Sequence, residues 1–185
     1  GFHPVFPWVS FMLIGLWFGK HDLSDNPFLK KTATASISVF ILTLIVSRVL
    51  IAFLSEGNPT IVTELEEILG TSLMPPLPIY MISGSSFALF IISMSVLIAE
   101  KFKNNVIILT LTKTGKLALT FYVVHVVVGM GIMFLFIPEK IGKLSIEFSI
   151  IYSLIFGLAC IIFANIWLKY KQIGPLEWVI RKFTK

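Results

Sequence analysis

Long apolar stretches separated by short polar connections set the pattern of this chain. At 1.5 Å rise per residue, a stretch of about 19 residues reaches roughly 28 Å as a helix, close to the thickness of a bilayer's hydrocarbon core. The pattern predicts an all-α protein, a polytopic transmembrane helix bundle of about five spans in a single membrane domain, residues 1–185. The predicted spans are residues 5–23, 33–54, 79–99, 115–136 and 145–168.

Two shorter segments have the pattern of amphipathic helices at the membrane surface. In residues 59–69, Asn58 and Pro59 match an N-cap and first helical residue, and Gly70 matches a stop. In residues 175–183, Gly174–Pro175 ends the fifth span and Trp178 is suited to the interface. Both segments are therefore predicted as interfacial helices, the second along the inner membrane surface.

Composition supports a membrane protein. Hydrophobic residues make up 56% of the chain and charged residues only 14%, with mean hydropathy +0.92, values that a soluble domain of this size would not tolerate. The single cysteine, Cys160, lies in an apolar run, so neither a disulfide framework nor a cysteine metal site is expected. No metal site is predicted.

The net charge of +5 comes from basic residues at the ends of the apolar segments, so it indicates topology and not nucleic-acid binding. Along the chain, Lys and Arg number three after the first span, none after the second, four in residues 100–116, two after the fourth span and five in the tail. High counts alternate with low ones. This predicts an external N-terminus and a cytoplasmic C-terminus.

His125 is the first residue to suspect of function, because it falls near the middle of the predicted span 115–136. Tyr122 precedes it by one turn on the same helix face. We expect the imidazole to point into the bundle, where its nitrogens can find partners. It acts either as a general base or as a structural residue hydrogen-bonded within the bundle.

Other polar groups are candidate substrate-binding residues. Arg48 lies near the far end of the second span, where it either snorkels outward or pairs with an acid. Ser83 and Ser86 lie in the third span, where such residues pack helices closely, bond back to the backbone, or line a polar cavity. With Tyr122 they form the substrate-binding set, while His125 and His3 are the candidate catalytic residues.

Three motifs in order resemble a known family. They are Gly1–Trp8 followed by Leu13–Gly19, Gly115–Tyr122 with His125, and Gly174–Arg181. Together they resemble the YeiB-like bacterial inner-membrane family in its C-terminal half, a domain of unknown function. That family is similar to heparan-alpha-glucosaminide N-acetyltransferases and related multi-pass acyltransferases.

The resemblance implies transfer of an acyl group to an extracytoplasmic acceptor in the bacterial inner membrane. Acyl-CoA or another acyl donor is then expected and no covalently bound cofactor, with the lipid bilayer and either other membrane helices or a homo-oligomer as partners. Relatives begin with helices that hold an Arg/Asp-rich signature and, in the acetyltransferases, a catalytic histidine. This chain has no such segment, so it is expected to be the C-terminal part of a longer protein, completed by other helices or inactive. The alternative function is a non-enzymatic membrane module, a transporter-like bundle or a structural partner.

Overall fold

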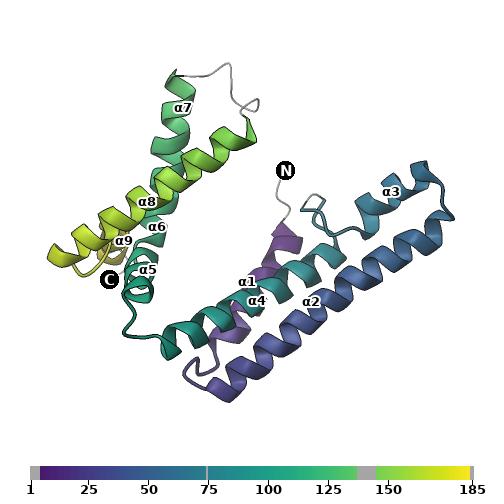
Figure 1. Ribbon diagram of the computed structural model, residues 1–185, viewed down its shortest axis with the longest axis horizontal. Helices are drawn as coiled ribbons and strands as arrows, with labels where there is room; N and C mark the ends of the chain where they lie inside the picture. The colour runs from purple at the N-terminus through teal and green to yellow at the C-terminus, as the bar shows by residue number, and fades with distance from the viewer. Residues whose placement is uncertain (1–4, 74, 137–144, 184–185) are drawn as a thin grey trace. The chain divides into compact units, whose positions relative to one another are not determined.

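The computed structural model describes residues 5–73, 75–136 and 145–183, and every regular element in these ranges is a helix. The all-α class is thereby confirmed. The chain divides into two compact units, Gly1–Lys101 and Phe102–Lys185. Unit 1 contains α1 (Val5–Gly19), α2 (Asn26–Ser55), α3 (Pro59–Leu69) and α4 (Pro78–Lys101) (Figure 1). Unit 2 contains α5 (Val106–Gly115), α6 (Ala118–Val124), the π-helix η1 (His125–Met130), α7 (Gly131–Phe136), α8 (Ile146–Tyr170) and α9 (Pro175–Phe183).

Four of the described helical stretches are long and apolar enough to cross a membrane. They are α2, α4, the continuous stretch 118–136 and α8, and they correspond to the last four predicted spans. The segment predicted as the first span, 5–23, instead forms the 15-residue helix α1, about 22 Å long. It ends at Gly19 because the polar residues from Lys20 onward form a turn.

The polar connection predicted over Lys20 to Lys31 is shorter than expected, because α2 already begins at Asn26. The Asp25 side chain accepts a hydrogen bond from the Phe28 amide at 3.3 Å, and Pro27 occupies the first turn. An N-cap followed by proline is a strong start signal. At 30 residues, α2 exceeds the bilayer core, so polar residues extend beyond its apolar part.

Small side chains pack the core of unit 1. Helix α2 packs along α4, with α3 folded back on α2 and α1 against α4. The buried positions on α2 and α4 are dominated by small residues: Ala33, Ser36, Ser47, Ser83, Ser85, Ser86 and Ser93. Small residues let helix backbones approach closely where there is no water to drive burial. A Cβ added at Gly15 or Gly19 would meet nothing within 4 Å, so these glycines mediate no close approach among the described residues.

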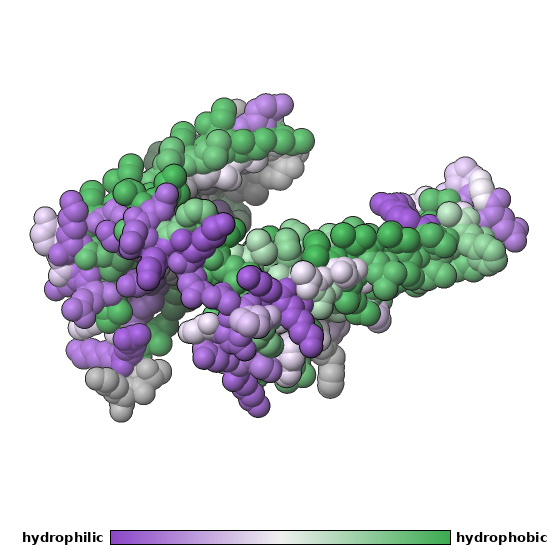
Figure 2. All heavy atoms as spheres, turned by 60° about the horizontal axis from the view of Figure 1, so that its bottom comes forward, coloured by the Kyte–Doolittle hydropathy of each residue, from purple (hydrophilic) through white to green (hydrophobic). Residues whose placement is uncertain are grey.

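Apolar side chains cover the long helices on the outside. Phe53 of α2 and Leu135 of α7 are 78% and 81% exposed. Figure 2 shows an apolar surface along the helices of unit 1, with hydrophilic residues gathered at the two ends of the unit. Exposure of this kind would be costly in water and is neutral in lipid, so it fits a membrane environment.

The predicted span 115–136 is not one regular α-helix. After α5 ends at Gly115, Lys116 and Leu117 form a turn, α6 starts at Ala118, and the backbone widens into η1 from His125 to Met130. An amphipathic or apolar pattern cannot distinguish α from π geometry over six residues. The sequence pattern therefore does not predict the widened turn.

Both predicted short segments form helices with the expected bounds, and their location at the membrane surface stays a prediction. Asn58 caps α3 through its side chain, which accepts from the Thr60 amide at 3.0 Å, and Gly70 ends that helix. Helix α8 stops at Tyr170 and α9 begins at Pro175. The chain therefore does not continue straight through Gly174–Pro175.

Candidate functional site

The histidine site in unit 2 is built around the start of the π-helix. The ring of His125 lies against Phe156 of α8, with ring centroids 5.4 Å apart. Gly129, buried one turn later, faces the same place: a Cβ at this glycine would lie 3.7 Å from His125 Nδ1 and 2.8 Å from the hydroxyl oxygen of Tyr152. The imidazole of His125 and the phenol hydroxyl of Tyr152 thus lie on either side of the position that a Gly129 side chain would occupy.

The absence of a Gly129 side chain is what lets Tyr152 enter this position, since a Cβ contact of 2.8 Å is shorter than real Cβ atoms show. Tyr152 is held by stacking on Phe148 and Phe156, at centroid distances of 6.3 and 6.5 Å. Within the described residues the His125 imidazole forms no hydrogen bond, and His125 remains exposed. The enclosed, hydrogen-bonded setting expected of a purely structural histidine is therefore not seen there.

An apolar cavity of about 380 Å³ adjoins the histidine site through Phe156. It lies between α6 and α8 and reaches Pro175 at the start of α9, with a lining of Thr120, Phe121, Val124, Phe156, Ala159, Cys160, Phe163 and Pro175. Apart from the Thr120 hydroxyl and the Cys160 thiol, its side chains are apolar. Such a cavity suits a hydrocarbon or other weakly polar chain.

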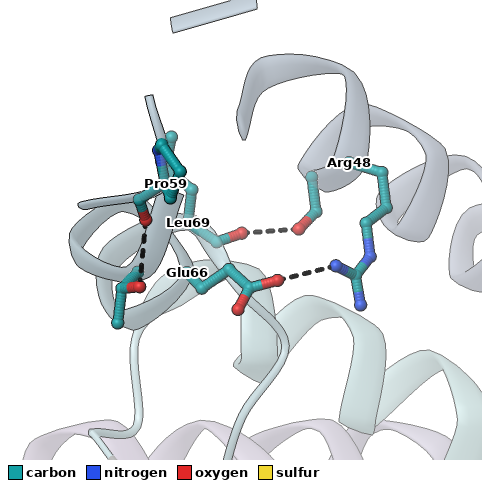
Figure 3. A network of polar contacts seen from close by, with 6 residues as sticks. Arg48, Pro59, Glu66 and Leu69 are labelled. Atoms are coloured by element: carbon teal, nitrogen blue, oxygen red, sulfur yellow. Dashed lines mark hydrogen bonds and ion pairs between the residues drawn. The ribbon is translucent and has the colours of Figure 1, made fainter. Parts of the chain in front are cut away.

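A polar site in unit 1 joins α2 to α3. The Arg48 guanidinium donates a hydrogen bond to Glu66 at 2.9 Å, forming an ion pair, and the two side chains are 75% and 49% exposed. Figure 3 shows both residues facing each other, with the Leu69 carbonyl beside them. Of the two alternatives for Arg48, pairing with an acid is confirmed.

The Ser47 hydroxyl fixes α3 against α2 by donating to the Leu69 carbonyl at 2.6 Å. Gly70 follows, and a Cβ there would clash with the Glu66 carbonyl oxygen, so the close turn needs a glycine. Together these residues border a cavity of about 320 Å³. Its lining combines a cation, a carboxylate and hydroxyl groups: Leu44, Ser47, Arg48, Ile51, Glu66, Gly70, Thr71 and Ser72.

Ser83 and Ser86 are buried within unit 1, and neither borders the cavity at Arg48. The Ser83 hydroxyl donates to the Tyr80 carbonyl at 3.0 Å. This is the hydrogen bond back to the backbone that was one of the predicted alternatives. Tyr122 is 68% exposed on unit 2. His3 lies outside the described residues. Roles for all four in substrate binding or catalysis stay predictions.

A third arrangement ties α9 to the start of α6. The Glu177 carboxylate accepts from the Thr120 amide at 3.1 Å and from the Thr120 hydroxyl, which in turn accepts from the Leu176 amide at 3.1 Å. A Cβ at Gly174 would clash with the Glu177 carboxylate unless that side chain moved, which would disturb its hydrogen bonds to Thr120. Partial burial alone would raise the pKa of Glu177, but the hydrogen bonds from Thr120 and nearby backbone amides outweigh it and lower the pKa.

Sequence reasoning missed three of these partners. Tyr152 lies in a continuous apolar helix, and only its proximity to Gly129 in space marks it. Glu66 is the acid that pairs with Arg48, and the sequence predicted such a pairing without naming which acid takes part. Thr120 and Glu177 are 57 residues apart, a separation that local spacing rules do not reach.

Helices of membrane-crossing length, apolar on the outside and joined by polar connections, define a multi-pass membrane protein. Residues 17–185 match the family described as Protein of unknown function (DUF418), and the chain belongs to this family. No curated protein and no solved structure matches it. The closer relation to YeiB-like proteins and acyltransferases stays a prediction.

Proposed function

We propose that this protein takes part in acyl transfer at the bacterial inner membrane, onto an extracytoplasmic acceptor, with His125 as the general base. One observation supports this above all: His125 Nδ1 and the Tyr152 hydroxyl flank a single point above Gly129, beside an apolar cavity. π-Helical turns within α-helical segments are frequent at functional sites. An unpartnered imidazole at membrane depth is also costly unless it has a use.

The chemistry follows from these groups. The neutral imidazole takes the proton of an acceptor hydroxyl or amine, whose oxygen or nitrogen attacks the carbonyl carbon of a thioester acyl donor. The carbon–sulfur bond breaks as the new ester or amide bond forms, and the imidazolium returns its proton to the departing thiolate. The Tyr152 hydroxyl is placed to donate a hydrogen bond to the carbonyl oxygen as negative charge develops there.

The adjoining apolar cavity would hold the non-reacting part of the acyl donor. Its volume of about 380 Å³ suits an acyl chain or the pantetheine arm of acyl-CoA. The separate cavity at Arg48 in unit 1 combines a guanidinium, a carboxylate and hydroxyl groups, which together match a polyhydroxylated group. On the predicted topology, Arg48 faces the external side.

The test compares acyl transfer between membranes from cells that express the full-length wild-type protein and membranes from cells that express its variants. Membranes receive radiolabelled acetyl-CoA, and label in the extracytoplasmic glycan and lipid fractions is measured. We expect His125→Gln to lower incorporation about 100-fold or more, the usual contribution of a general base, with the protein still inserted. His21→Gln is the matched control, since His21 lies at the end of α1 and stacks on Phe28 at 4.5 Å. Full incorporation by inserted His125→Gln protein would refute the role of His125.

A non-enzymatic membrane module is the second candidate. It is favoured by the absence, within the described residues, of a hydrogen-bonded carboxylate that would orient the His125 ring. This function predicts no label above vector control for the wild-type protein. The same assay therefore separates the two candidates.

A further inference from the structure

The junction between α8 and α9 forms a second, open-sided apolar cavity, of about 530 Å³. Two indole rings form much of its wall, Trp167 from α8 and Trp178 from α9. Ile173, Pro175 and Val179 complete the apolar part, and Lys171 and Gln172 border it. This cavity takes no part in the proposed acyl transfer.

Hydrogen bonds hold the walls of this cavity in place. Trp167 Nε1 donates to the Ile173 carbonyl at 3.0 Å, which closes the turn between the helices. On the other side, the Glu177 carboxylate fixes α9 to Thr120. The cavity is therefore preformed, so a ligand would lose little affinity to ordering of the protein.

The rim of the cavity is cationic. Lys171 borders it, and Lys182 Nζ lies 5.4 Å from the centre of the Trp178 ring. Arg181 adds a third cation on α9. The acid of this helix, Glu177, directs its carboxylate to Thr120 and forms no ion pair with these cations within the described residues, and the three cations outnumber this single acid.

We propose that this cavity binds one anionic phospholipid. The cavity follows directly after the membrane-length helix α8, where head groups meet acyl chains. The two indoles are suited to this depth, since tryptophan favours the membrane interface. An acyl chain enters between Trp167 and Trp178, and the phosphate group pairs with Lys171 and Lys182. Charge complementarity selects an anionic lipid over a zwitterionic one.

Tryptophan fluorescence tests the proposal in the intact protein. With Trp8→Phe and Trp17→Phe, the two tryptophans left in this chain both line the cavity. The protein is reconstituted in phosphatidylcholine vesicles that contain a small fraction of brominated lipid, either phosphatidylglycerol or phosphatidylcholine. We expect brominated phosphatidylglycerol to quench at lower mole fraction, because bromine quenches only on contact.

Charge removal then locates the site. Lys171→Gln and Lys182→Gln should each weaken the preference for phosphatidylglycerol about fivefold, the usual effect of one lysine at an anionic surface. The matched control is Lys20→Gln, which removes the same charge beside the end of α1 and should keep the preference. Membrane insertion is checked for every variant.

Three results would overturn the proposal. They are equal quenching by both brominated lipids, an equal loss of preference in the control variant, and an identical spectral change when inorganic phosphate is added to pure phosphatidylcholine vesicles. The second would indicate general surface charge, and the third would indicate a phosphate site without lipid. Because His125 takes no part, failure of acyl transfer leaves this test unaffected.

Discussion

At the residue scale, the side chains that organise unit 2 act through long-range hydrogen bonds. Glu177 satisfies the amide of Thr120 at the start of α6, where helix amides lack partners within the helix. The Thr120 hydroxyl oxygen in turn accepts a hydrogen bond from the Leu176 amide. One carboxylate thereby fixes the relative position of α6 and α9, and Gly174 supplies the space that it needs.

We expect Glu177→Gln to destabilise unit 2 by about 1–2 kcal/mol, because a charge-assisted hydrogen bond is replaced by a neutral one. Thermal unfolding can be followed by reaction of Cys160 with a thiol-specific dye. Glu64→Gln, on the exposed side of α3, is the matched control. An unchanged melting temperature for Glu177→Gln would contradict the role of this carboxylate.

The same residue predicts a pH dependence. Because the folded-state pKa of Glu177 lies below its ordinary value of 4.5, its charged form stabilises the folded protein fully above that value. This contribution is lost as the pH falls through the folded-state pKa. The melting temperature of the wild type should therefore fall more steeply below pH 4.5 than that of Glu177→Gln.

At the scale of elements, the π-helix η1 is the feature that distinguishes the fourth predicted span from an ordinary membrane helix. Its widened turn places Gly129 against α8 and leaves His125 beside Phe156. A π-turn offers poorer packing than an α-turn and persists where a contact or a function stabilises it. Here the inserted Tyr152 hydroxyl is that contact.

Gly129→Ala should displace Tyr152, since the new Cβ would lie 2.8 Å from its hydroxyl oxygen. We expect a loss of about 1–3 kcal/mol from overpacking, measured by the same Cys160 reaction. Adding Tyr152→Phe removes the clashing oxygen and should restore stability without restoring acyl transfer. Gly157→Ala is the control, because a Cβ there meets nothing within 4 Å. Equal stability of Gly129→Ala and wild type would show that Tyr152 does not occupy this position.

At the scale of the whole molecule, the distribution of charge predicts the orientation in the membrane. The connection after α2 contains Glu56, Glu64, Glu66 and Glu67 but no Lys or Arg, while the tail after α8 contains three lysines and one arginine. Cytoplasmic connections retain positive charge. The α2–α3 turn is thus expected outside and the C-terminus in the cytoplasm.

Fusions of alkaline phosphatase, which is active only outside the cytoplasm, test this topology. A fusion after Gly57 should be active, and a fusion after Lys185 should be inactive although expressed at the same level. A cytoplasmic reporter, β-galactosidase, should give the reverse pattern at both positions. Strong phosphatase activity at Lys185 would contradict the predicted cytoplasmic C-terminus.

The sequence alone determined the all-α class, four spans of membrane-crossing length and both short helices. These features depend on local signals: apolar length, an N-cap followed by proline at Asn58–Pro59, and a glycine–proline stop at Gly174–Pro175. The early start of α2 was missed although Asp25 and Pro27 give the same kind of signal, because the lysines that follow were assigned to the connection.

Only the tertiary structure decided which polar groups meet. Arg48 had several acids within reach, and the return of α3 along α2 selects Glu66. Tyr152 approaches His125 because a glycine and a π-turn leave room for it. Glu177 finds Thr120 because α9 folds back to the start of α6. Each pairing depends on how two helices pack in space, whereas hydrophobic periodicity reports only which face of one helix avoids water.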